Sequence, residues 1–207
     1  MHAFNVWWVK NILAPLVVFI AERILGWRVD GETPPLDKFM LIAEPHTTNW
    51  DLVVMFYWAC KQRRQVHYVI KKEVFNWPLL SPFFGWTGGI PMDRESPLAS
   101  LKAVMRAAKS HERFILLIAP SGTRGYTEGW KPGFYYLAQK TGLPIVPSGP
   151  DYARKLARIT APIMPSGDIE ADIAGMQPFY ENMIGHHPEN ATPVRLLHEE
   201  RAEAATL

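Results

Sequence analysis

Residues 39–51 read FMLIAEPHTTNWD, an apolar run followed by a polar turn and by the start of a second apolar segment. The apolar residues at 39–43 are typical of a strand that is buried on both faces of a sheet. Pro45 disfavours helical backbone in the residue before it, so the strand ends at this point. The segment at 50–62 predicts a helix. A strand, a turn and a helix in this order indicate one unit of an α/β fold.

Short apolar runs alternate with helix-like segments over most of the remaining chain. Further strands are predicted at 66–70, 89–92, 114–119, 145–147 and 157–163. Further helices are predicted at 96–110, 133–141 and 168–183. This alternation predicts a single α/β domain with a mixed, largely parallel sheet flanked by helices. Functional side chains in such folds lie at the carboxyl ends of the strands.

The turn after the first of these strands contains His46, and Asp51 follows five residues later. On a continuous helix, residues five apart diverge by about 140°, so these two side chains would not meet. Here His46 precedes the helix, Thr48 or Asn49 would cap it, and Asp51 lies in its first turn. The carboxylate can then fold back onto the imidazole. A carboxylate on one ring nitrogen fixes the tautomer and leaves the other nitrogen free as a base.

The sequence PSGTRG at 120–125 directly follows the predicted strand at 114–119. A glycine turn at a strand end exposes backbone N–H groups, and Arg124 adds a fork that matches phosphate or carboxylate oxygens. A plain loop with a surface arginine would look the same. Ser121 lacks the Gly-x-Ser-x-Gly context of a nucleophilic serine, which argues against that role.

Three other segments resemble parts of a site more weakly. The sequence GGIPMDR at 88–94 is a short predicted strand with Arg94 just past its end. The lysine pair at 71–72 follows another strand, although short basic pairs usually lie on a solvated surface. The apolar strand within LPIVP at 143–147 is interpreted as structural.

Composition excludes several classes of protein. A length of 207 residues suits one domain, and a net charge of +2 without a basic stripe argues against a nucleic-acid partner. Cys60 is the single cysteine, so no intrachain disulfide can form. His186 and His187 are adjacent and have no further ligand cluster nearby, which favours a surface position over a metal site.

The N-terminal segment at 4–27 is strongly apolar, but its charge-free part, 11–21, is about 16 Å long as a helix. Spanning a bilayer takes about 30 Å, and no cleavage site for a signal peptide follows. We expect two short helical pieces that meet at Pro15 and end near Gly26. Tryptophans near both ends suit a membrane interface, and docking on the protein core is the alternative.

The stretch at 74–91 is mostly apolar, yet the prolines at 78 and 82 and three glycines argue against a helix there. Its aromatic side chains have few polar neighbours, so they must pack on something apolar. Core packing, the wall of a site for a fatty chain, and a face pressed into lipid remain open.

In order and spacing, four of these segments resemble the lysophospholipid acyltransferase family, which includes bacterial 1-acylglycerol-3-phosphate acyltransferases. The family's blocks are a histidine and an aspartate separated by four residues, a Gly-Ile strand with an arginine after it, the sequence Pro-Glu-Gly-Thr-Arg, and a proline-bearing apolar strand. The matching positions, in block order, are His46 and Asp51; Gly89, Ile90 and Arg94; Pro120, Gly122, Thr123 and Arg124; and 144–147. The resemblance covers about residues 40 to 150.

The resemblance implies an enzyme of phospholipid biosynthesis with a glycerophosphate-acyltransferase-like fold, placed on the cytoplasmic face of a membrane. The donor would be acyl-CoA or acyl carrier protein, and the acceptor a hydroxyl of a lysophospholipid-like membrane lipid. His46 would be the general base, assisted by Asp51, without a metal or other cofactor. The substrate-binding residues would be Arg94, Arg124, Gly122, Thr123, Ser121 and Lys71, with Lys71 or backbone N–H groups stabilising an oxyanion.

One departure from the family stands out. Ser121 occupies the position where the third block normally has glutamate, so a negative charge is missing beside Arg124. A different headgroup, or an acceptor without phosphate, therefore remains open. A hydrolase of lipid esters or thioesters and a non-catalytic peripheral membrane protein are the competing hypotheses. The expected organisation is interfacial helices at 1–27, the acyltransferase domain at 28–188 and a C-terminal tail at 189–207.

Overall fold

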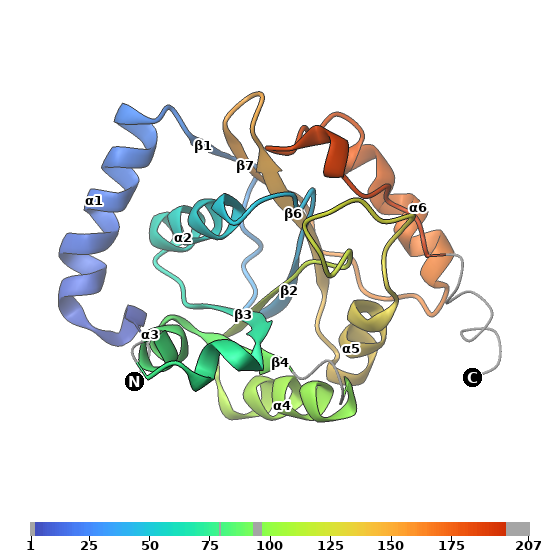
Figure 1. Cartoon of the computed structure of the whole chain (residues 1–207), viewed down its shortest axis with the longest axis horizontal. Helices are drawn as coiled ribbons and strands as arrows, with labels where there is room; N and C mark the ends of the chain where they lie inside the picture. Colours follow the sequence, from blue (N-terminus) through green and yellow to red (C-terminus); the bar gives the residue numbers. More distant parts are fainter. Residues whose placement is uncertain (1–2, 79, 93–96, 198–207) are drawn as a thin grey trace.

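A sheet runs through the middle of the molecule, and helices cover both of its faces (Figure 1). The computed structural model describes residues 3–78, 80–92 and 97–197, and within them seven strands form this sheet. The strands are β1 (Arg28–Asp30), β2 (Lys38–Ala43), β3 (Val66–Lys71), β4 (Gly89–Met92), β5 (Phe114–Ile118), β6 (Ile145–Asp151) and β7 (Leu156–Ile159). Their order across the sheet is β1-β7-β6-β2-β5-β3-β4.

The sheet is mixed and largely parallel, as predicted. Strand β2 lies in the interior and pairs in parallel with β5 on one side and β6 on the other. Strand β3 continues this parallel set from β5 to β4. Only the pairing of β6 with β7 is antiparallel among the described strands, and β1 follows the direction of β7. The carboxyl ends of β2, β3, β4, β5 and β6 therefore lie along one edge of the sheet.

Apolar side chains alternate along β2 and build a core on each face of the sheet. Met40 and Ile42 face the cluster that includes three helices on one side, while Phe39 and Leu41 face the other side, with α2 and the N-terminal helix. The helices are α2 (Trp50–Gln62), α3 (Leu80–Thr87), α4 (Pro97–Ser110), α5 (Gly133–Thr141) and α6 (Ile169–Tyr180). Helices α4, α5 and α6 belong to the first cluster. A strand that is apolar on both faces requires this three-layer arrangement.

The N-terminal helix is continuous, so the expected break at Pro15 is wrong. Two π-helical turns flank a short α-helix, and the Ala14 N–H reaches back to the Val9 carbonyl. A wider turn accommodates the missing N–H and the ring of Pro15, which would clash with the carbonyl four residues earlier in a regular α-helix. The helix ends as predicted near Gly26, whose φ is +77°. Its parts are η2 (Val9–Leu13), α1 (Ala14–Phe19) and η3 (Ile20–Ile24).

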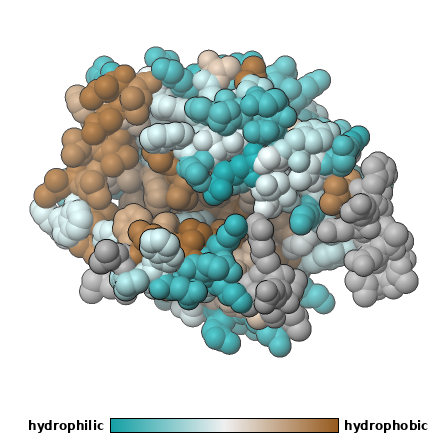
Figure 2. Space-filling model, viewed as in Figure 1, coloured by the Kyte–Doolittle hydropathy of each residue, from teal (hydrophilic) through white to brown (hydrophobic). Residues whose placement is uncertain are grey.

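One side of this helix packs on α2 and the other is exposed. The small residues Ala14 and Ala21 are buried, and Glu22 accepts hydrogen bonds from Lys61 (2.7 Å) and Tyr57 (3.0 Å) of α2. Figure 2 shows hydrophobic residues gathered over the outer side. The exposed apolar residues there are Trp7, Trp8, Ile12, Leu13, Leu16, Phe19, Ile20, Ile24 and Leu25. In the described part of the chain, no helix is both long enough and apolar enough to span a membrane.

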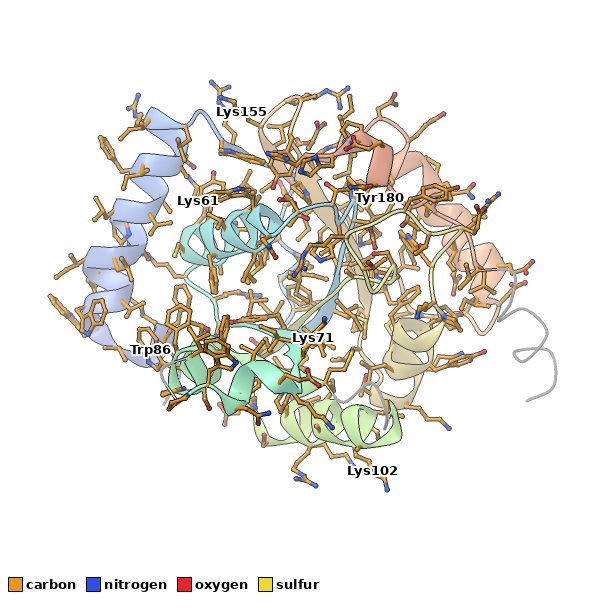
Figure 3. The ribbon with its side chains drawn as sticks, viewed as in Figure 1. Lys61, Lys71, Trp86, Lys102, Lys155 and Tyr180 are labelled. Carbon is orange, nitrogen blue, oxygen red and sulfur yellow. The ribbon has the colours of Figure 1, made fainter. Side chains whose placement is uncertain are left out.

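The stretch at 74–91 contains a helix that the sequence argument excluded. Helix α3 includes Pro82 and Gly85. Pro82 falls in its first turn, where a backbone N–H needs no partner, which explains why the proline is tolerated. Trp86 packs on the N-terminal helix, with its ring centre 6.2 Å from that of Trp8 (Figure 3). Trp77 and Phe83 are exposed, so this stretch has both a packed and an open side.

The part of the predicted C-terminal tail at 189–197 packs on the domain instead of lying free. Leu196 is buried, and its backbone pairs with that of Trp130. Arg195 also forms an ion pair with Glu128 at 2.8 Å. The segment is packed because Leu196 is apolar, and burying its side chain against the Trp130 segment stabilises this position although the neighbouring residues are charged. The remainder of the predicted tail, 198–207, lies outside the described residues.

Candidate active site

A cavity of about 480 Å³ opens at the carboxyl ends of the parallel strands. His46 follows β2, Lys71 ends β3 and Arg124 lies in the loop after β5, and all three line the cavity. The cavity extends beneath α2 between the helix and the sheet. Its inner wall is mostly apolar and includes Leu41, Leu52, Val54, Met55, Trp58, Tyr68, Ile70 and Leu117. The site is therefore a polar mouth that leads into an apolar chamber.

The predicted contact between His46 and Asp51 is present. The His46 Nδ1 atom lies 2.9 Å from the Asp51 Oδ2 atom. The His46 side chain is 23 % exposed and the Asp51 side chain 5 %. Because Asp51 engages Nδ1 from within the protein, the Nε2 nitrogen is the one left for the cavity. This arrangement suits a base whose tautomer is fixed by a buried acid.

The carboxylate of Asp51 is held by the backbone as well as by the histidine. Its Oδ2 atom also accepts hydrogen bonds from the N–H groups of Thr47 (2.9 Å) and Thr48 (3.0 Å). Asn49 occupies the N-cap position of α2, but its side chain makes no capping hydrogen bond. Thr48, the other predicted cap, accepts the Trp50 N–H through its Oγ1 atom at a longer 3.4 Å, so the turn is organised mainly around Asp51.

Tyr152, which the sequence analysis did not identify, completes the surroundings of Asp51. Its hydroxyl donates to Asp51 Oδ1 at 2.8 Å. Burial, followed by the neighbouring Asp51 carboxylate, raises the pKa of Tyr152 well above its usual value, so the phenol stays a donor. The Tyr152 ring also packs edge-on against Trp27 and His186. No sequence signal could identify this residue, because it lies about a hundred positions from Asp51.

Glu44 is a second residue that the sequence analysis did not assign to the site. It is 2 % exposed and lies directly after β2. Its Oε2 atom accepts from the His46 N–H at 2.9 Å, and its Oε1 atom accepts from the Ser121 N–H at 3.0 Å. Burial raises the pKa of Glu44, and the hydrogen bonds from Ser121 and His46 oppose that rise. A glutamate ending an apolar strand was the available signal.

The loop after β5 brings Gly122, Thr123 and Arg124 to the mouth of the cavity, as predicted. Gly122 has a φ of +66°, which favours glycine, and its N–H donates to the Ala119 carbonyl at 3.0 Å. A second hydrogen bond, from the Lys131 N–H to the Pro120 carbonyl (3.0 Å), holds the loop where it leaves the sheet. The loop is therefore fixed, with its arginine exposed at the rim.

The other residues singled out in the sequence divide into four groups. Lys71, labelled in Figure 3, reaches the cavity from β3. Ser121 is 1 % exposed and donates its hydroxyl to the Thr123 carbonyl (3.1 Å), so it is not placed to attack a substrate. Arg94 lies outside the described residues. His186 and His187 are exposed, as expected for a surface position.

Comparisons with known proteins agree on one family. The family model described as Acyltransferase matches residues 26–149, more than half of the chain. A 1-acyl-sn-glycerol-3-phosphate acyltransferase of Streptococcus pneumoniae is 29 % identical over 137 residues, which are 60 % of this chain and 49 % of that protein. One of Bacillus subtilis is 32 % identical over 130 residues, 60 % of this chain and 63 % of that protein. The chain thus spans about half the length of the curated relatives it matches.

A solved structure shares the fold. The crystal structure of the 1-acyl-sn-glycerophosphate (LPA) acyltransferase PlsC from Thermotoga maritima aligns with a TM-score of 0.52 over 79 % of this chain and 73 % of that one. Its sequence identity of 16 % supports the architecture alone. The chain belongs to the acyltransferase family, and the resemblance to lysophospholipid acyltransferases is confirmed.

Proposed function

We propose that the chain is an O-acyltransferase that moves a fatty acyl group from a thioester to a hydroxyl of a lysophospholipid-like acceptor. The observation that carries this proposal is the 2.9 Å contact between His46 and Asp51 at the mouth of a cavity that Arg124 also lines. It joins a base, a phosphate-binding group and an apolar chamber in one site.

In the proposed reaction, the His46 Nε2 atom takes the proton of the acceptor hydroxyl as its oxygen attacks the thioester carbonyl. The new C–O bond forms, the C–S bond then breaks, and the proton on His46 passes to the leaving thiolate. Asp51 stabilises the imidazolium between these steps. General-base catalysis of this kind contributes roughly 10²–10⁴-fold. The thioester is already activated, so the step needs no cofactor.

The cavity divides the substrates between its two parts. The apolar wall under α2 suits a fatty acyl chain, because burying each methylene group stabilises the complex by about 0.8 kcal/mol. Lys71 at the rim would stabilise the oxyanion of the tetrahedral intermediate. Arg124, with Gly122 and Thr123 beside it, would hold the acceptor phosphate. Acyl-CoA or acyl carrier protein would present the thioester from outside.

The proposal includes a position at a membrane surface. The N-terminal helix has an exposed apolar side, which would contact the lipid layer in which the acceptor lipid resides. Trp77, before α3, and Phe83, within it, add further exposed apolar surface. Such a surface suits a helix that lies in the interface rather than across it. The proposed donors are cytoplasmic thioesters, which points to the cytoplasmic face.

The direct test is the release of free CoA from long-chain acyl-CoA in the presence of a lysolipid. We expect the purified chain to release CoA only with an acceptor, and His46→Ala to reduce the rate at least about a hundredfold. His187→Ala is the matched control, because its ring is exposed and does not line the cavity, and its hydrogen bond to Thr47 is made by the backbone N–H, which the substitution keeps. Unchanged turnover in a folded His46→Ala protein would refute the mechanism.

The same assay separates the two competing functions. A hydrolase would release CoA at the same rate without an acceptor. A non-catalytic membrane-binding protein would show no turnover on any donor, and its flotation with vesicles would not depend on His46 or Asp51. The buried environment of Asp51, which four hydrogen-bond donors surround, favours the enzyme, because a lipid-binding surface alone has no use for it.

A further inference from the structure

We propose that Glu44 is a positioning residue whose carboxylate joins the turn that carries His46 to the loop that carries Arg124. In this chain it supplies the acidic group that residue 121 lacks. The inference rests on the proposed function, since it assigns the two joined segments to the base and to the acceptor site.

The bridge consists of two backbone hydrogen bonds to the two oxygens of one side chain. One oxygen of Glu44 accepts the N–H of His46 at 2.9 Å, and the other accepts the N–H of Ser121 at 3.0 Å. The two donors come from segments 75 residues apart in the sequence. Arg124 follows Ser121 by three positions. A single side chain thus fixes the relative position of the base and the arginine.

The backbone of Glu44 is itself held against strand β6, which makes the bridge effective. Its N–H donates to the Ser148 carbonyl of β6 at 3.2 Å. A Cβ atom on Gly149 would lie 1.7 Å from the Glu44 carbonyl oxygen, so the backbone segments at residues 44 and 149 approach more closely than any residue with a side chain would allow. The carboxylate therefore extends from a fixed point on the sheet to two separate connections, the His46 turn and the loop after β5.

The chemistry of the side chain explains why an acid is needed. A carboxylate accepts hydrogen bonds with both oxygens, whereas an amide has one acceptor oxygen and one donor nitrogen. Glutamine at position 44 would keep the volume but would set an N–H₂ group against one of the two N–H donors. Ser121 leaves the loop without the acidic side chain that the family resemblance implies at that position, and the Glu44 carboxylate reaches the same residue through its backbone N–H.

The role as a positioning residue differs from a purely structural one in the kinetic constants that it changes. Loss of the bridge displaces His46, which lowers kcat, and displaces the arginine loop, which raises KM for the lysolipid acceptor. It leaves KM for the acyl donor unchanged, because the apolar chamber lies under α2. A residue that only stabilised the fold would reduce the amount of active enzyme and leave both KM values unchanged.

The first experiment measures kcat and both KM values of Glu44→Gln with long-chain acyl-CoA and a lysolipid. We expect kcat/KM for the acceptor to fall at least about tenfold, with donor KM within about twofold of the original. Asp172→Asn is the matched control, because Asp172 also bridges two segments, through Tyr135 (2.6 Å) and Ser166 (2.7 Å), outside the site. Equal kinetic constants in Glu44→Gln and the unchanged enzyme would overturn the inference.

The second experiment moves the carboxylate to the other loop. Glu44→Ala and Ser121→Glu should each lose activity, the first by removing the acid and the second by forcing two acids together. The double variant should recover to within about threefold of the unchanged enzyme, a strongly non-additive result for residues in contact. A folded double variant that is no more active than the less active single variant would argue against relocation of the carboxylate. If the double variant does not fold, the kinetic constants of Glu44→Gln decide the question.

A third measurement separates this inference from the proposed function. Amide hydrogen exchange at His46 and Ser121 reports the bridge without turnover, and both amides should exchange faster in Glu44→Gln. If both amides exchange faster in Glu44→Gln but the unchanged protein acylates no lysolipid, the bridge is supported and the proposed function is rejected. Unchanged exchange together with full acceptor-dependent activity would reject the bridge alone.

Discussion

Asp51 shows how one side chain can organise a turn at the mouth of a cavity. Its carboxylate receives two backbone N–H groups, the histidine nitrogen and a tyrosine hydroxyl, while being nearly excluded from water. Buried charges require such partners, since an unpaired one is costly. The five-residue spacing to His46 could be recognised in the sequence because the turn is local.

Tyr152 should act on catalysis through Asp51. Tyr152→Phe removes one oxygen and leaves Asp51 Oδ1 without its 2.8 Å donor. We expect kcat to fall about three- to tenfold, which corresponds to roughly 1 kcal/mol for one hydrogen bond. Steady-state kinetics of the purified variant with saturating acyl donor and acceptor provide the measurement.

The control for this change is Tyr135→Phe, which removes a comparable hydrogen bond to Asp172 away from the cavity. It should lower thermal stability without lowering kcat. If Tyr152→Phe behaved in the same way, Tyr152 would be a structural residue only.

Among the elements, those with clear local signals were predicted best. Helix α2 begins at Trp50 and ends at Gln62 as predicted, and α5 also has its predicted bounds. The failures are instructive. Strand β1 was not predicted, because its three residues are too few to show an alternating apolar pattern. Helix α3 was rejected because of its proline and glycine, although the position of Pro82 within the helix decides the effect.

The contacts that complete the site were beyond the sequence. Tyr152 reaches Asp51 from the connection between β6 and β7, and Glu44, after β2, reaches Ser121 in the loop after the neighbouring strand β5. Both contacts depend on which strands are neighbours, and apolar patterns do not encode strand order. The sequence could therefore locate the carboxyl ends of the strands, but not which side chains meet there.

The N-terminal helix should bind lipid through its outer side. Leu16 and Phe19 are 51 % and 57 % exposed, so replacing both with glutamate should leave the fold intact. Each charge placed in the apolar part of an interface is unfavourable, and we expect flotation with phospholipid vesicles to fall at least about tenfold. Activity on a micelle-dissolved lysolipid should decrease much less than activity on vesicles.

A single substitution, Met164→Glu, is the matched control for that surface. Met164 is an equally exposed apolar residue outside the N-terminal helix and α3. Equal loss of flotation in both variants would show that added negative charge, and not the helix, determines binding.

At the scale of the whole molecule, buried tyrosines should limit stability in alkali. Burial is the largest cause of a raised pKa in five of them, namely Tyr57, Tyr68, Tyr135, Tyr152 and Tyr180. A tyrosine in the unfolded chain ionises near about pH 10, whereas these five tyrosines stay protonated at that pH in the folded protein. The unfolded chain then binds fewer protons, so the free energy of unfolding should fall as pH rises above about 10. Urea unfolding at a series of pH values measures this slope.

Tyr180→Phe should make that slope shallower, because its hydroxyl is fully buried between β2 and β6. A free energy of unfolding that stays constant from about pH 9 to pH 11 would contradict the prediction. Cys60, whose pKa burial raises to about 11, contributes with the same sign, so Cys60→Ala belongs in the same series.

The ion pair between Glu22 and Lys61 has a consequence for how the enzyme would sit on a bilayer. It joins the N-terminal helix to α2, and the first turn of α2 holds Asp51. On the proposed location, the height of the base above the acyl tails is thus set by rigid helix packing and not by a flexible tether. The protein would thus select lysolipids by the distance of their free hydroxyl from the hydrocarbon boundary, because the rigid packing fixes the distance of His46 from that boundary.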